Sequence, residues 1–142
     1  MEELENDFIR FWIEDGILYS EYKKPTDITL ENAKRLIALR HELSNNKKQY
    51  WCYDFKGLKS FTKEGRDYAD IHGQDFLHAS AAVVNSHITM FLFNIFVKIK
   101  NVKIPFKAFK NKDKEVKWLK ELKTHHYNNN MIGRDTHENN RK

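Results

Sequence analysis

Hydroxyl and basic side chains that could bind an anion follow the apolar run of residues 50–55. They are Lys59, Ser60, Thr62, Lys63 and Arg66. Thr62 is a good N-cap residue, and the helix-like spacing after it predicts a helix over residues 62–72. The free N–H groups and the dipole at a helix start favour an anion. Two interpretations stay open, a small anion-binding or partner-docking surface and ordinary capping beside a solvated basic face. Asp54 either joins this surface or binds backbone N–H groups in the turn.

No familiar catalytic motif accompanies this cluster. The sequence contains no phosphate-binding loop, nucleophile elbow, His-Glu-x-x-His zinc helix or Rossmann glycine pattern. Its seven histidines are scattered, so we expect no metal site. The single cysteine, Cys52, lies inside the apolar run and is interpreted as a buried structural thiol. We therefore expect a protein that is not an enzyme and uses no cofactor.

The net charge of +5 is unevenly distributed along the chain. Residues 98–123 carry ten lysines and three acidic residues but no arginine. Arginine is the usual bidentate reader of phosphate and guanine, so we interpret this stretch as a solvated surface and expect no nucleic-acid partner. A peripheral lipid contact is allowed but not required. Residues 1–7 do not resemble a secretory signal, and the longest apolar stretch, 88–97, is too short to span a bilayer, so we expect a cytoplasmic protein.

The apolar periodicity predicts a single α/β domain over residues 1–123 with the order ββαβαβαβα, a mixed sheet with flanking helices. A polar, Asn-rich stretch over residues 124–142 is expected to be a disordered tail. The predicted strands and helices are a hairpin of strands 8–13 and 17–22, helix 29–44, strand 50–55, helix 62–72, strand 76–84, helix 87–99, strand 106–109 and helix 112–123.

Three residues carry specific expectations about packing. Thr29 is expected to cap the helix that runs to Ser44. The aliphatic stem of Arg40 is expected to cover the edge of that helix's apolar stripe. Glycine in a first helical turn is unfavourable, so Gly65 predicts close packing against a neighbour.

The predicted helix 87–99 is apolar almost all round its axis. A single sheet covers only about half of such a helix, because an amphipathic helix needs an apolar stripe of ~100° or a little more. The helix is either core on more than one side or covered by a second subunit, a lipid tail or another hydrophobic ligand. Symmetric pairing is the commonest solution in soluble proteins, so we expect a homodimer with Phe91, Phe93 or Phe96 at or near the interface.

Two short motifs give the chain a resemblance. Residues 54–57 read Asp-Phe-Lys-Gly and residues 62–65 read Thr-Lys-Glu-Gly. They resemble the Asp-Leu-Ser-Gly and Asp-Ser-Ser-Gly patterns of the STAS domain, the SpoIIAA-like fold of anti-sigma-factor antagonists. The chain looks closer still to bacterial STAS/SEC14-like single-domain proteins of unknown function. The resemblance covers residues 7–123. Lys63 stands where those antagonists carry the phosphorylated serine, and a lysine cannot accept phosphate in that switch.

The resemblance implies a SpoIIAA-like fold and a non-enzymatic protein-interaction or regulatory module. The alternative is a carrier or sensor of a small lipid-like hydrophobic ligand. A closed core beside a flat, exposed 56–66 surface favours the interaction module. A continuous apolar cavity under helix 87–99 favours the carrier.

Overall fold

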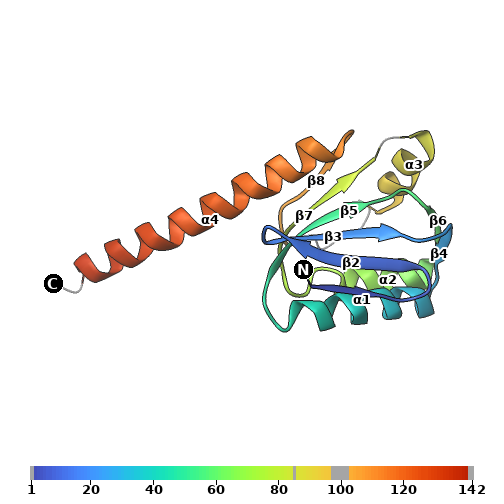
Figure 1. The fold of residues 1–142 in the computed structure, drawn as a ribbon, viewed down its shortest axis with the longest axis horizontal. Helices are drawn as coiled ribbons and strands as arrows, with labels where there is room; N and C mark the ends of the chain where they lie inside the picture. The colour runs from blue at the N-terminus through green and yellow to red at the C-terminus, as the bar shows by residue number, and fades with distance from the viewer. Residues whose placement is uncertain (1, 85, 97–102, 141–142) are drawn as a thin grey trace.

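The structure, a computed structural model, describes residues 2–84, 86–96 and 103–140 (Figure 1). The side chains of residues 88, 92, 93, 95 and 96 and of those beyond 129 lie outside this description. The strands and helices are β1 Glu3–Glu5, β2 Ile9–Glu14, β3 Ile17–Tyr22, β4 Thr26–Ile28, α1 Leu30–Ser44, β5 Gln49–Asp54, β6 Leu58–Phe61, α2 Lys63–His72, β7 Leu77–Val83, α3 His87–Phe96, β8 Phe106–Phe109 and α4 Lys112–Asn140.

Six strands form one mixed sheet in the order β1-β2-β3-β5-β7-β8. β1, β2 and β3 pair antiparallel, and β3, β5, β7 and β8 pair parallel. The predicted α/β class, the opening hairpin and the central position of β5 are confirmed. β7 starts one residue later than expected, because Phe76 has a left-handed backbone with φ of 58°.

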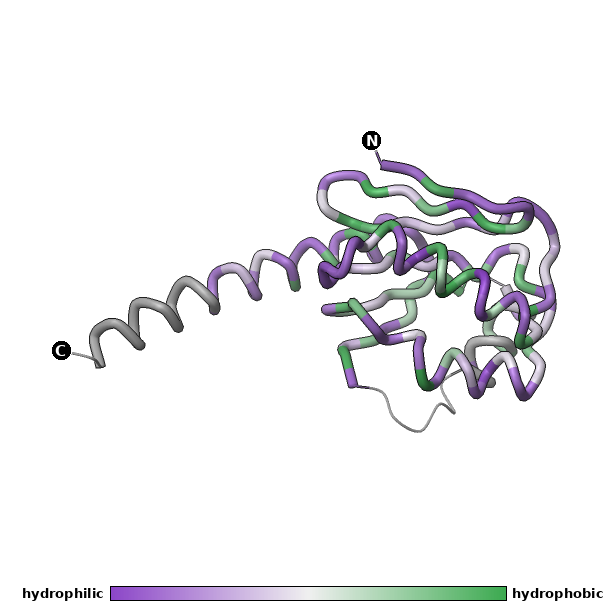
Figure 2. Tube along the Cα trace, turned by 90° about the horizontal axis from the view of Figure 1, so that it is seen from below, coloured by the Kyte–Doolittle hydropathy of each residue, from purple (hydrophilic) through white to green (hydrophobic). Residues whose placement is uncertain are grey.

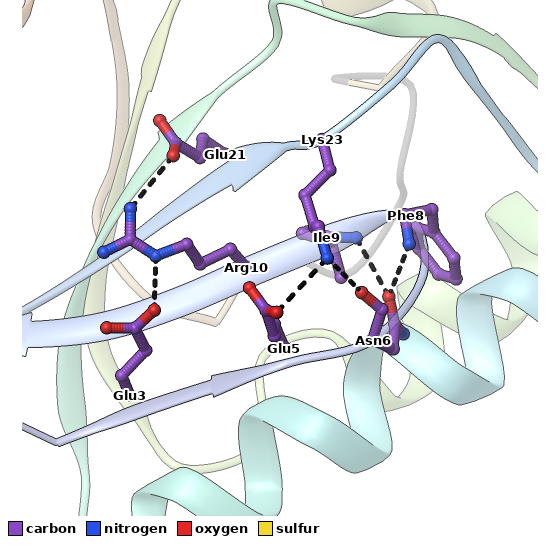
Figure 3. A network of polar contacts seen from close by, with 8 residues as sticks. All are labelled: Glu3, Glu5, Asn6, Phe8, Ile9, Arg10, Glu21 and Lys23. Carbon is purple, nitrogen blue, oxygen red and sulfur yellow. Dashed lines mark hydrogen bonds and ion pairs between the residues drawn. The ribbon is translucent and has the colours of Figure 1, made fainter.

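β1 was not expected from the sequence, because its residues are mostly polar. It is an edge strand that pairs with β2 and is covered by charged side chains (Figure 3). Arg10 donates through Nε to Glu3 at 2.6 Å and through Nη1 to Glu21 at 3.2 Å. Lys23 Nζ lies 3.3 Å from a carboxylate oxygen of Glu5. Exposed ion pairs of this kind add little stability. Their main effect is that charged side chains on an edge strand disfavour its pairing with another chain.

A second, two-stranded ladder was also missed. β4 and β6 pair in parallel, with Ile28 opposite Phe61. The next residues, Thr29 and Thr62, are the N-caps of α1 and α2, and their hydroxyls accept hydrogen bonds from Asn32 N at 3.2 Å and Gly65 N at 3.0 Å. Both predicted caps are confirmed. The short ladder therefore makes the two helices start side by side and run in the same direction.

Gly65 shows why the helices pack so closely at that end. A Cβ atom built on Gly65 would lie 2.3 Å from the carbonyl oxygen of Ile28, which is backbone and has little room to shift. The expected close packing of Gly65 is confirmed. Only glycine lets the first turn of α2 approach the end of β4 this closely.

The sheet separates two apolar clusters. On one face α1 and α2 cover Phe11, Leu18, Trp51, Tyr53 and neighbouring side chains. On the other face α4 covers a smaller cluster that includes Tyr50, Cys52 and Leu119. Cys52 is 3% exposed, which confirms its interpretation as a buried thiol. Arg40 is buried with the apolar stripe of α1, and its guanidinium is buried together with the aliphatic stem that was expected to cover the edge of the stripe.

α4 extends past the expected end of the domain at Lys123. It leaves the body of the molecule and continues to Asn140 (Figure 1), where residues 124–142 had been expected to form a disordered tail. The coloured turns at the start of the projecting part are mostly hydrophilic (Figure 2). Its first residues still belong to the packed structure, because the rings of His126 and Tyr50 lie 5.7 Å apart. This contact shows that the helix still packs on the sheet just beyond Lys123, and the expected disorder of the rest of the tail stays a prediction.

Glu115 in the first turns of α4 is fully buried, and its carboxyl group lies beside the Cys52 thiol and the backbone of Tyr53. Burial, together with the negative charge of Asp54, raises the pKa of Glu115 to about 8. The thiol of Cys52 lies beside it, and burial raises the pKa of that thiol too. The α4 face of the sheet therefore holds a carboxyl group that is mostly protonated at neutral pH.

Part of α3 is exposed. Met90 is 38% and Phe91 64% exposed, which fits the expected excess of apolar surface on this helix. The side chains of Phe93 and Phe96, the other candidates for a dimer interface, lie outside the described residues. None of the helices in the described part of the chain is long and apolar enough to cross a membrane.

Removing the α2 cap should destabilise the domain. Thr62→Ala deletes the oxygen that accepts from Gly65 N, so the free energy of unfolding should fall by roughly 0.5–2 kcal/mol. Thr62→Ser keeps the hydroxyl and should recover most of the loss. Urea unfolding of both variants measures this, and an unchanged midpoint for Thr62→Ala would show that the cap contributes nothing.

Burial of Glu115 should make stability depend on pH. The unfolded carboxyl has its ordinary pKa of 4.5 and the folded one about 8, so between these values the folded protein binds more protons. The free energy of unfolding should therefore fall as pH rises from about 4.5 to about 8 and then level off.

Glu115→Gln should remove this slope and stabilise the protein at pH 8 by at least about 1 kcal/mol, since one pKa unit corresponds to about 1.4 kcal/mol. Glu121→Gln, an exposed site on the same helix, should leave the slope unchanged. Urea unfolding at several pH values measures the slope. A slope in Glu115→Gln identical to that of the wild type would contradict its assignment to Glu115.

The expected homodimer stays a prediction that Phe91 can test. Wild type should sediment as a dimer, and Phe91→Glu should give a folded monomer, because this side chain is already exposed in the single chain. Asn94→Glu adds the same charge at another exposed position of α3 and is the control. A wild type that sediments as a monomer at high micromolar concentration would rule the dimer out.

Candidate functional site

An apolar cavity of about 90 Å³ lies between the sheet and the helices α1 and α2. Trp51, Tyr53 and Phe55 form its wall on the sheet side. Leu36 and Ile37 of α1 and Ala69 of α2 line it from the helix side. Ile104 just before β8, Phe106 at its start and Gln74 after α2 line one side of it. The cavity is thus built by elements far apart in the sequence.

The sheet wall is an aromatic ladder along β5. Side chains two residues apart point to the same face of a strand, so Trp51, Tyr53 and Phe55 stand in a row. Trp51 and Tyr53 have ring centroids 5.0 Å apart with planes at 85°, and Tyr53 and Phe55 are 4.8 Å apart at 84°. Edge-to-face packing is a favoured arrangement of aromatic rings. Nε1 of Trp51 donates to Ser20 Oγ at 2.9 Å, which fixes the first ring.

Tyr22 and Tyr53 bring a polar pair to this wall. Both residues line the cavity, and their hydroxyls share a hydrogen bond. Their rings lie 5.9 Å apart and nearly perpendicular. Burial raises the pKa of each hydroxyl well above the ordinary value of 10, so both stay protonated at neutral pH.

The buried Arg40 lies at the edge of the cavity. Its Nη2 donates to the carbonyl oxygen of Gly73 at 3.1 Å, and its guanidinium stacks over the ring of Trp51 at 5.0 Å. Gly73 and Trp51 both line the cavity. Burial lowers the pKa of Arg40 to about 10, so it remains charged at neutral pH. Nε and Nη1 have no hydrogen-bond partner among the described residues.

Gln74 connects the helix layer to the last strand. The backbone N–H of Lys103 donates to Oε1 of Gln74 at 2.6 Å. This bond holds the residues just before β8 against the end of α2. Ile104 is thereby placed in the cavity wall.

The predicted cluster from Asp54 to Arg66 extends from the end of β5 through β6 to the first turn of α2. Three of its polar groups have structural partners. Asp54 Oδ1 accepts from Lys56 N at 2.8 Å, Ser60 Oγ donates to Asp27 Oδ1 at 2.7 Å, and Thr62 caps α2. Lys59 and Lys63 are exposed and Arg66 is partly buried. These contacts support the capping interpretation, and an anion- or partner-binding role for the cluster stays a prediction.

A histidine cluster on the opposite face of the sheet was not expected. Tyr50 stacks on His78 with centroids 5.0 Å apart, and the ring of His126 lies 5.5 Å from His78. Burial and the neighbouring His126 lower the pKa of His78. No group of three or more potential metal ligands occurs among the residues that the structure describes. The ring of His126 on α4 thus packs against Tyr50 and His78 of the sheet.

The described residues that line the cavity come from the sheet, the β4–β6 ladder, α1, the end of α2 and Ile104 just before β8. The carrier alternative places the cavity under helix 87–99, most of whose side chains lie outside the described residues, so that position stays a prediction. Tyr22 and Tyr53 were visible only as parts of two predicted strands. Their meeting depends on the parallel register of β3 and β5, in which Ser20 lies opposite Tyr53. No sequence pattern sets that register.

The architecture has a counterpart among solved structures. An uncharacterized protein of the DUF3478 family from Shewanella loihica PV-4, with a SpoIIAA-like fold, is similar with a TM-score of 0.57 and 16% sequence identity. The match covers 82% of this chain and 98% of that one. At this identity the likeness shows the fold alone, and it confirms the predicted SpoIIAA-like fold.

The sequence comparisons are narrower. No curated protein matches the chain. One family model, described as a domain of unknown function, matches residues 11–123, which include β3, β5 and both cavity-covering helices. Because the match spans most of the 142 residues, the chain belongs to the family described as Domain of unknown function (DUF7793).

Proposed function

We propose that this protein is a non-enzymatic binding module that holds a small hydrophobic molecule between the sheet and helices α1 and α2. The observation that carries the proposal is the cavity itself, which lies under two helices and is lined almost entirely by apolar side chains. Close packing is the rule in protein interiors, so an apolar space of this size forfeits contacts that a ligand would supply.

The size of the cavity limits the ligand. An engineered apolar cavity of about 150 Å³ binds benzene. A space of about 90 Å³ therefore suits a short alkyl chain or, after a small outward movement of the helices, a single ring. Each buried methylene contributes about 0.8 kcal/mol, so a ligand with four of them gains about 3 kcal/mol from burial. Binding of such a ligand is weak to moderate, as expected of a sensor.

One segment, Phe61 and Thr62, could connect the cavity to the expected regulatory role. Phe61 lines the cavity, and the next residue, Thr62, caps α2. A ligand that displaces Phe61 would move the start of α2 and the basic side chains of Lys59 and Lys63. We propose that this surface, predicted as the partner-docking surface, reports the state of the cavity.

Filling the cavity should abolish ligand binding. Benzene should raise the thermal midpoint of the wild type and shift amide resonances of the cavity-lining residues. Ala33→Leu and Ala69→Leu place extra methyl groups into the cavity from α1 and α2, and each should weaken benzene binding at least about tenfold. Ala38→Leu makes the same change on the exposed side of α1 and should bind normally.

Overpacking a core costs about 1–3 kcal/mol of stability. Because the two variants fill the cavity from different helices, one of them remains usable if the other is destabilised. Cooperative unfolding of each variant is checked before binding is measured. A wild type whose midpoint and resonances do not respond to saturating benzene would contradict the proposed function.

A further inference from the structure

We infer that the ligand of this cavity carries one hydrogen-bond acceptor, the oxygen of a ketone, aldehyde or ester, and that the Tyr22–Tyr53 hydroxyl pair donates a hydrogen bond to it. The inference rests on the proposed function and specifies its ligand class.

The pair has one hydrogen-bond proton more than it uses. Two hydroxyls carry two protons, and the bond between Tyr22 and Tyr53 consumes one. Neither hydroxyl has a further hydrogen-bond partner among the described residues. The second proton therefore has no acceptor among the described residues, in a wall where Tyr53 is buried and Tyr22 partly buried and an unsatisfied donor is unfavourable.

The surroundings of the pair define what can accept that proton. The rings of Trp51 and Phe55 lie on either side of Tyr53, and the opposite wall is formed by aliphatic residues of α1. A hydrocarbon fills this space but leaves the proton unpaired. A neutral carbonyl compound both fills the space and accepts the proton.

A carboxylate is a poorer match at this position. Its full charge would enter an apolar cavity with a single neutral donor, which costs far more than transferring a carbonyl group. The nearest buried cation is Arg40, but its Nε and Nη1 atoms are closed off by the surrounding side chains. A neutral oxygen at the tyrosine pair is therefore favoured over an anion at Arg40.

Tyr→Phe variants separate this role from simple packing. Cyclopentanone and methylenecyclopentane have the same shape, and only the ketone accepts a hydrogen bond. The ratio of their affinities should fall about three- to tenfold in Tyr22→Phe/Tyr53→Phe relative to wild type. Each single variant keeps one hydroxyl whose proton is then free, so its ratio should stay within about twofold of wild type.

The double variant removes both partners of a bond, a change that is often nearly neutral for stability, and its folding is checked by cooperative unfolding. If it does not fold, the carbonyl ¹³C resonance of labelled cyclopentanone bound to wild type replaces it. Donation of a hydrogen bond should move this resonance downfield of its position in an apolar solvent. A resonance at the apolar-solvent position would overturn the inference.

The remaining outcomes are distinct. Binding of both probes with a ratio that the double variant does not change would overturn the inference and leave the proposed function standing. Hexanoate binding more tightly than cyclopentanone would also overturn it, because recognition would then belong to a cation. Failure of benzene, methylenecyclopentane and cyclopentanone alike to bind would remove the proposed function itself.

Discussion

The structure depends on the burial of β5 on both of its faces. Along one face Trp51, Tyr53 and Phe55 meet edge to face at right angles and form a stiff aromatic wall. On the other face Tyr50 and Cys52 pack under α4. A slip of one residue would exchange the two sets of side chains. The three aromatic rings would then collide with α4, and the small thiol would face the space between the sheet and α1. The alternation within six residues therefore specifies which face carries the cavity.

The opposite wall is set by a much smaller element. The β4–β6 ladder joins the ends of two loops and makes α1 and α2 start from adjacent threonine caps. Gly65 then draws α2 against the end of β4. The helices are thus held tightly at their N-terminal ends, while Arg40 and Gly73 connect them further along. A helix layer fixed at both ends cannot collapse fully onto the aromatic wall, which gives a physical reason for the space left between them.

Local features of the fold could be predicted from the sequence, whereas long-range features could not. The roles of Thr29, Thr62 and Gly65 can be predicted from the residues next to them in the sequence. The hairpin is predicted by alternating apolar residues, and β5 by a continuous apolar run. β1 and the β4–β6 ladder are short and polar, so only their backbone pairing reveals them. The burial of the Arg40 guanidinium could not be predicted, because a helical pattern shows which face a residue occupies but not how deeply it is buried. The cavity depends on the register between β3 and β5, which no stretch of sequence encodes by itself.

The protein without ligand has two unfavourable features in the space between the sheet and helices α1 and α2. An apolar cavity lacks the dispersion contacts of a packed core, and one hydroxyl proton of the tyrosine pair has no acceptor among the residues that the structure describes. A small neutral molecule with one acceptor oxygen would remove both costs at once. Because such a ligand binds only the folded chain, its binding would raise the free energy of unfolding in proportion to the logarithm of its concentration once that concentration exceeds Kd. Helix α2 covers the cavity and begins at the exposed basic surface. A change in the stability of this helix would therefore couple ligand binding in the cavity to partner binding at the surface.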